Sequence, residues 1–260
     1  YDGYNMLVTD EGYMVIATPG EENSKGKVFF SQVPVSELGG TIDLETDISA
    51  SYTIVNDELG NPDLALNEIN LDTEDTHITS VTGSQSDDNF GAYLSYGDID
   101  NDGVKEILIS APGAGYYGVV YVYDQTGTLV GVIFGSEEKP VQSIMTSSYI
   151  AETLDDVFFG PNNQALNQDL HYEEPLTDAD TSTLTFFLAG SESFNDSIDL
   201  AITDSDASIE TLDQFQSAAF GDINGDDKDD LILASSDGTI YLFFGTLDSG
   251  SNIDTLSADV

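Results

Sequence analysis

Residues 89–124 constrain the fold most, because three strand-like runs follow one another there with turn residues between them. The run at 90–96 ends at Gly97, the run at 105–111 is rich in Ile and Leu, and the run at 119–123 is β-branched and aromatic. Glycine and proline separate the last two runs. The pattern predicts an antiparallel sheet whose first two strands are joined by an acidic loop.

The acidic loop offers carboxylates at a spacing that suits a metal ion, with Gly103 at its sharp turn. The predicted ligands are the side chains of Asp98, Asp100, Asp102 and Glu106 and the carbonyl of Val104. Such a set fits a hard cation that takes roughly six to eight oxygen ligands. An EF-hand would have Glu at the twelfth position, which here is Ile109, and flanking helices. We therefore predict a calcium loop (Ca2+) between strands; the alternative is a solvated turn.

A second loop of the same spacing lies within residues 215–245, again between strand-like runs. Its predicted ligands are Asp222, Asn224, Asp226 and Asp230 and the carbonyl of Lys228. Asp227 stands where Gly103 stands in the first loop, and it needs a left-handed backbone that Asp adopts less readily than Gly. Because one ligand is a neutral Asn, we expect this loop to bind calcium more weakly.

Two further copies of the unit are inferred from the layout of the runs. Residues 1–31 repeat it with the acidic loop cut down to Asp10-Glu11-Gly12, and residues 144–203 repeat it without a recognisable metal loop. In the latter copy, the runs at 183–190 and 198–203 predict a strand, a turn and a strand. We expect a single region over residues 1–260, with units at about 1–82, 83–143, 144–207 and 208–260.

Two long insertions interrupt the repeat, at residues 32–75 and 160–180. The first contains one strand-like run at 51–55 and a short helical pattern at 64–69, and we expect it to lie on a sheet edge. Long insertions of this kind are common places for binding residues, although a variable solvated loop is the alternative.

The chain is extremely acidic, with 49 Asp and Glu against 5 basic residues, all lysine, and a net charge of −44. This charge argues against nucleic acid and against anionic membrane surfaces as partners. A hydrophobic content of 40% distinguishes the chain from a disordered acidic tail. We expect dense salt to screen its self-repulsion, as in a halophilic protein. No cysteine is present for a disulfide or thiolate site, and no run has the ~18 apolar residues of a membrane helix.

Several motifs together resemble the FG-GAP repeat, the blade of the integrin alpha-subunit β-propeller and of related bacterial and archaeal surface proteins. The matching stretches are residues 90–91, 97–103, 110–113 and 118–123, and residues 215–245 match less completely. The resemblance implies an all-β fold of β-propeller-like blades, each with four antiparallel strands, with calcium in the loop between the first two strands and long loop insertions. It also implies an extracellular or cell-surface location in a bacterium or archaeon. The family closes rings of more than four blades, so the chain is expected to be an excerpt of a longer propeller or a different arrangement; its start at Tyr1 fits a mature product or an excised piece.

The favoured function is a non-enzymatic, calcium-binding recognition or adhesion module. It would bind a protein or a glycan, or pack against copies of itself in a surface layer or fibre. The alternative is a carbohydrate-active hydrolase or lyase built on a β-propeller, because a catalytic carboxylate pair would be hidden among so many acidic residues. Catalysis has little other support: His77 and His171 lie in different units, and nucleophile and phosphate-binding motifs are lacking.

Overall fold

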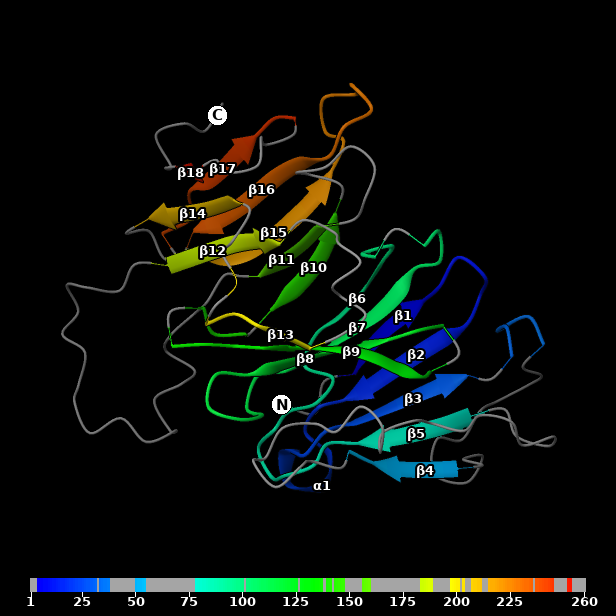
Figure 1. Ribbon diagram of the computed structural model, residues 1–260. Coiled ribbons are helices and arrows are strands. Elements are labelled where there is room, and N and C mark those ends of the chain that lie inside the picture. Colours follow the sequence, from blue (N-terminus) through cyan, green and yellow to red (C-terminus); the bar gives the residue numbers. More distant parts are fainter. Residues whose placement is uncertain are drawn as a thin grey trace. The chain divides into compact units, whose positions relative to one another are not determined.

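The computed structural model of the protein describes strands and turns in both halves of the sequence (Figure 1). The described residues are 4–31, 33–37, 50–54, 78–100, 102–125, 127–137, 139–141, 143–147, 156–159, 183–188, 197–201, 203, 207–211, 215–235, 237–245 and 252–253. They form four sheets and one four-residue helical turn, and none of these sheets closes on itself. The all-β prediction is confirmed. The predicted helix at 64–69, the insertion at 160–180 and both histidines lie outside the described residues.

The chain divides into two compact units, residues 1–141 with 191–203 and residues 142–190 with 204–260. The first unit contains the first and second sheets, and the second unit contains the third and fourth sheets. The prediction of a single propeller-like region stays a prediction.

The first sheet has the strand order β1-β2-β3-β5-β4. Its strands are β1 (Asn5–Val8), β2 (Met14–Thr18), β3 (Lys27–Ser31), β4 (Ala50–Thr53) and β5 (Ile78–Thr82). Neighbours are antiparallel except β4, which runs parallel to β5 at the sheet edge. The strand β4 belongs to the insertion at 32–75, so this part of the insertion lies on a sheet edge as expected.

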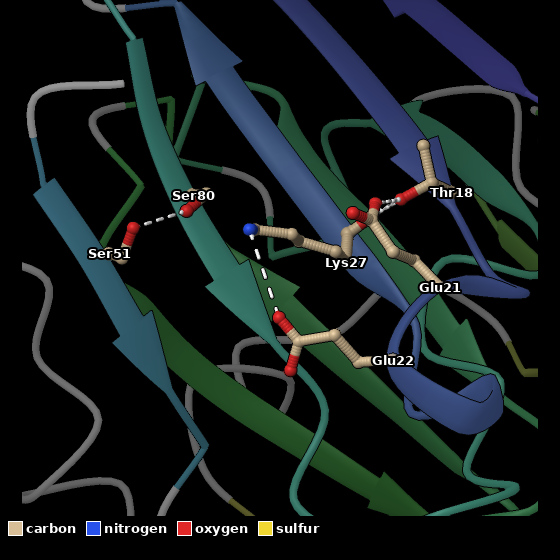
Figure 2. Close-up of polar contacts among 6 residues, drawn as sticks. All are labelled: Thr18, Glu21, Glu22, Lys27, Ser51 and Ser80. Carbon is tan, nitrogen blue, oxygen red and sulfur yellow. Dashed lines mark hydrogen bonds and ion pairs between the residues drawn. The ribbon is translucent and has the colours of Figure 1, made fainter. Parts of the chain in front are cut away.

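Polar side-chain contacts lie at two places in the first sheet, in the connection between β2 and β3 and at the β4 edge (Figure 2). The hydroxyl of Thr18 donates to the Glu21 carboxylate at 2.8 Å, where the helical turn α1 (Glu21–Ser24) begins. Three consecutive residues from Glu22 onward have positive φ, so α1 is a tight left-handed turn rather than a true helix. The hydroxyls of Ser51 and Ser80 lie 3.0 Å apart and join β4 to β5.

The second sheet has the order β13-β9-β8-β7-β6. Its strands are β6 (Leu94–Gly97), β7 (Glu106–Ala111), β8 (Val119–Tyr123), β9 (Leu129–Phe134) and β13 (Ser197–Asp199). The first four are antiparallel, and β13 runs parallel to β9. Both runs predicted as strands at 183–190 and 198–203 contain a strand, but the two do not pair with each other, since β12 (Thr183–Leu188) belongs to another sheet. The physical reason is burial: Ile198 reaches 8% exposure beside β9, and the Leu200 N–H donates to the Phe134 carbonyl.

Alternate residues of the first and second sheets form one hydrophobic core. Phe30 of β3 lies against Tyr123 of β8, with ring centroids 5.4 Å apart. Phe90 packs edge-on against Tyr121 at 5.1 Å and is fully buried. The predicted strand at 90–96 begins only at Leu94, because Phe90 is a core residue in a turn that Gly91 continues at φ +90°.

The third sheet has the order β10-β11-β12-β14-β18 and the fourth the order β15-β16-β17. Their strands are β10 (Ile144–Ser147), β11 (Asp156–Phe159), β12 (Thr183–Leu188), β14 (Ala207–Thr211), β15 (Phe215–Gly221), β16 (Asp230–Ser235), β17 (Ile240–Phe243) and β18 (Asn252–Ile253). All neighbours are antiparallel except β18, which is parallel to β14. Three of the four described sheets thus carry a fifth strand parallel to the fourth, a feature that the four-stranded expectation missed.

Candidate metal centre

The first acidic loop joins β6 to β7, and the register of these strands brings its two ends together. Gly97, the last residue of β6, pairs with Glu106, the first residue of β7. As a result, carboxylate oxygens of Asp98, Asp100 and Glu106 all lie within 4.8 Å of one another. Three of the predicted ligands therefore converge, whereas Asp102 is exposed and lies outside this cluster in the described loop.

Burial makes the charge of this cluster costly. Asp100 and Glu106 are each only 4% exposed. Burial raises the pKa of Glu106 to about 8, the N–H of Ile99 that donates to it at 3.1 Å opposes the rise, and the neighbouring Asp carboxylates add to it. A cation among these oxygens would reverse the effect, because opposite charge favours the ionised carboxylate.

Backbone N–H groups hold the other carboxylates of the first loop in position. Asp102 N donates to Asp100 Oδ1 at 3.0 Å, Gly103 N to Asp98 Oδ2 at 3.2 Å and Val104 N to Asp102 Oδ1 at 2.6 Å. The loop thus orders its own oxygen donors. A ligand role for the Val104 carbonyl stays a prediction.

The second acidic loop, between β15 and β16, repeats this hydrogen-bond pattern. Gly221 pairs with Asp230 as Gly97 pairs with Glu106. The four shared bonds run from Ile223 N to Asp230, Asp226 N to Asn224, Asp227 N to Asp222 and Lys228 N to Asp226, at 2.9, 2.9, 3.0 and 3.1 Å. Asp227 has φ +63°, close to the +85° of Gly103, so the predicted left-handed backbone is present.

The second loop differs from the first in that its carboxylates accept more hydrogen bonds from backbone N–H groups. Asp222 also accepts the N–H groups of Gly225 and Asp226, at 2.6 and 3.0 Å. Burial by itself would raise the pKa of Asp230, but N–H groups of Gly245, Ile223 and Asn224 donate to it and lower that pKa overall. Among the described residues, the second loop brings no three carboxylates together as the first loop does. Roles for Asn224 and for the Lys228 carbonyl stay predictions.

Contacts from the β1–β2 turn reach the first loop, and the sequence interpretation missed them. Lys105 Nζ lies 2.8 Å from Asp10 Oδ2 and 5.2 Å from the centroid of the Tyr96 ring. The Tyr96 hydroxyl donates to Glu11 at 2.8 Å; burial first, and Glu11 second, raise the pKa of Tyr96 to about 12. The sequence did hold a signal for these contacts, which is the rarity of basic residues. Lys105 is one of only 5 lysines in the chain, and its place inside an acidic loop indicates a specific acidic partner.

A comparison of the chain with protein-family models finds no match. A comparison with curated protein sequences also finds none. In the described part of the chain, no helix has the length and apolar character to cross a bilayer.

Proposed function

We propose that the protein is an extracellular, calcium-binding recognition or assembly module built from FG-GAP-like repeats. The observation that carries the calcium part is the convergence of carboxylate oxygens of Asp98, Asp100 and Glu106 within 4.8 Å of one another. All three donors are hard carboxylate oxygens, the ligand class that calcium prefers and that soft metals do not. The donor set therefore fits the ion that the repeat resemblance implies.

Calcium in this position would stabilise the fold rather than perform chemistry. The converging donors come from the loop after β6 and from Glu106 at the start of β7, so the protein itself supplies these ligands and none of them is a substrate group. The raised pKa of Glu106 supports this assignment, because a bound cation would favour the ionised carboxylate that burial and the neighbouring carboxylates disfavour. Recognition would then use the long insertions at 32–75 and 160–180. The partner is a protein, a glycan or a second copy of the chain.

Thermal unfolding in calcium and in EDTA tests the metal assignment. Bound calcium should add about 2.7 kcal/mol at a hundredfold excess over Kd. Asp98→Ala should remove most of this gain, whereas Glu37→Ala, which removes one exposed charge outside both loops, should leave it intact. An equal calcium response in both variants would contradict the proposed site.

Deletion of residues 160–180 tests the recognition part. The calcium-dependent gain in melting temperature should persist, while capture on protein and glycan arrays, or self-association in sedimentation, should weaken. Turnover of a polysaccharide that is abolished by changing one carboxylate outside the two loops would instead favour the enzyme.

A further inference from the structure

The turn between β1 and β2 contacts both ends of the first acidic loop. Tyr96 lies in β6, where the chain enters the loop, and Lys105 directly precedes Glu106, the first residue of β7. The Tyr96 hydroxyl donates to the Glu11 carboxylate at 2.8 Å, and Lys105 Nζ lies 2.8 Å from Asp10 Oδ2. Each end of the loop is therefore held by one acidic side chain of the turn.

The turn is itself fixed in place, so it can position the loop. Thr9 is 4% exposed, its N–H donates to the Tyr13 carbonyl at 2.8 Å, and its carbonyl accepts the Gly12 N–H at 2.9 Å. In β1, the side-chain amide of Asn5 donates to the two carbonyls of residues 91–92, at 2.9 and 2.7 Å. These bonds join the first sheet to the chain that leads into β6 without using any carboxylate of the loop.

Lys105 brings a positive charge next to a proposed calcium ligand, because Glu106 follows it in the sequence. An ammonium group and a bound cation repel each other. Asp10 offsets the charge of Lys105, and the Tyr96 ring, whose centroid lies 5.2 Å from Nζ, adds a cation–π contact. The side chains of Lys105 and Asp10 are 39% and 69% exposed, so the expected contribution of this ion pair is modest.

The second acidic loop differs from the first at both of these positions. By the shared strand register of the two loops, Phe220 corresponds to Tyr96. Phenylalanine has no hydroxyl that could donate a hydrogen bond. Asp229 corresponds to Lys105 and carries the opposite charge. The ligand spacing is thus shared by the two loops, whereas the tyrosine and the lysine at the loop ends distinguish the first loop from the second.

We propose that the β1–β2 turn raises the calcium affinity of the first loop through two positioning residues, Asp10 and Glu11. Glu11 holds Tyr96 and so fixes the end of β6 from which the ligand Asp98 follows, which lowers the cost of ordering the loop around the ion. Asp10 holds Lys105 and offsets a charge that would otherwise repel the ion. This inference rests on the proposed calcium function, because it takes the ligands of the first loop as given.

Isothermal titration calorimetry of the full chain with calcium tests the role of Asp10. Every protein carries Asp226→Ala, which disables the second loop, and the ionic strength is physiological, so that distant charges are screened. Asp10→Asn should raise Kd about threefold, which is the size expected for the loss of a partly exposed ion pair. In a Lys105→Gln background the same change should have little effect, because the charge that Asp10 offsets is gone. Glu37→Gln, which removes an exposed charge elsewhere, should leave Kd unchanged.

Tyr96→Phe tests the other end of the loop. It removes the hydroxyl that donates to Glu11 and gives the first loop the aromatic residue that the second loop has in Phe220, so Kd should again rise about threefold. Tyr116→Phe removes a hydroxyl from a residue that is 92% exposed and should leave Kd unchanged. Urea denaturation in EDTA measures the calcium-free stability of each variant, which separates a change in affinity from a general loss of stability.

The outcomes distinguish this inference from the calcium function on which it rests. If calcium binds and the Kd values of Asp10→Asn and Tyr96→Phe equal those of their controls, the turn has only a structural role and the inference is overturned, while the calcium function stands. An effect of Asp10→Asn that is undiminished in the Lys105→Gln background would also overturn it, because simple loss of one negative charge would then explain the result. A first loop that binds no calcium in the parent protein would overturn both.

Discussion

The two acidic loops have the same spacing, the same strand register at their ends and the same four backbone hydrogen bonds. The pKa values of their terminal carboxylates nevertheless shift in opposite directions. Glu106 has a pKa raised to about 8, whereas the pKa of Asp230 is lowered. Burial is the largest cause of the rise at Glu106, and the neighbouring Asp carboxylates add to it; at Asp230, hydrogen bonds from backbone N–H groups outweigh burial. In the described part of the chain, one N–H donates to Glu106 and three donate to Asp230. The shared spacing thus specifies the loop, while burial, neighbouring carboxylates and N–H donors together set the pKa of its terminal carboxylate.

The largest expected effect is an opposite sign when each terminal carboxylate is made neutral in calcium-free protein. Glu106→Gln should raise the free energy of unfolding by about 2 kcal/mol at pH 7, because it removes an ionisable group whose burial is unfavourable. Asp230→Asn should lower it. Both oxygens of Asp230 accept N–H groups, so the amide NH₂ of Asn must face a donor.

Urea denaturation in EDTA measures both variants under one condition. Glu37→Gln serves as the charge control, since it removes one negative charge from an exposed position in a chain of net charge −44. A change of the same sign in Glu106→Gln and Asp230→Asn would show that the two loops are electrostatically equivalent after all.

The next expected effect is a pH dependence that only the first loop produces. Between the ordinary pKa of 4.5 and the folded value of about 8, the folded chain keeps a proton on Glu106 that the unfolded chain has lost. Stability of the calcium-free protein should therefore fall as pH rises through this window, with a slope of up to about 1.4 kcal/mol per pH unit. The difference between wild type and Glu106→Gln in EDTA isolates this slope from the other carboxylates. The slope should vanish in saturating calcium, and a flat difference curve in EDTA would contradict the raised pKa.

The sequence predicted the fold class and the strands near the two acidic loops because local chemistry determines both. Apolar runs separated by glycine fixed β7 and β8, and the left-handed position of Asp227 followed from its alignment with Gly103. These features depend on residues that are close in the sequence, so they can be predicted from one sequence alone.

The parallel fifth strands were not predictable in the same way. The strand β13 has only three residues, and its partner β9 lies more than sixty residues earlier in the chain. A short apolar run carries no information about which distant edge it will pair with. The pKa difference was hidden for the same reason: Gly245, which donates to Asp230, lies 15 residues beyond it and outside the loop motif.

A smaller effect is expected from exchanging the side chain at the second ligand position. Asn224→Asp should strengthen calcium binding by the second loop, and Asp100→Asn should weaken binding by the first, because each change alters the ligand charge by one. A change of about tenfold in Kd is expected for each. Isothermal titration calorimetry separates the sites when the other loop is silenced. Asn224→Asp is combined with Glu106→Gln, which disables the first loop, and Asp100→Asn is combined with Asp226→Ala, which disables the second. If Asn224→Asp leaves the calcium affinity of the second loop unchanged, the backbone N–H groups that donate to its carboxylates determine that affinity more than the ligand charge does.

The smallest expected effect concerns the turn position that the loops share. Asp227 has φ +63°, and Gly103 has φ +85° with no atom within 4 Å of the place where its Cβ would be. Asp227→Gly should therefore stabilise the second loop by up to about 1 kcal/mol by relieving left-handed strain, and Gly103→Asp should destabilise the first loop by a similar amount without a clash. The added flexibility of Gly in the unfolded chain reduces the first gain. Chemical denaturation in EDTA compares the two variants with wild type. Equal and opposite shifts would indicate that the backbone geometry of the loops is the same and that their difference lies in the carboxylates; a large loss from Gly103→Asp alone would show that the first loop is also held more rigidly.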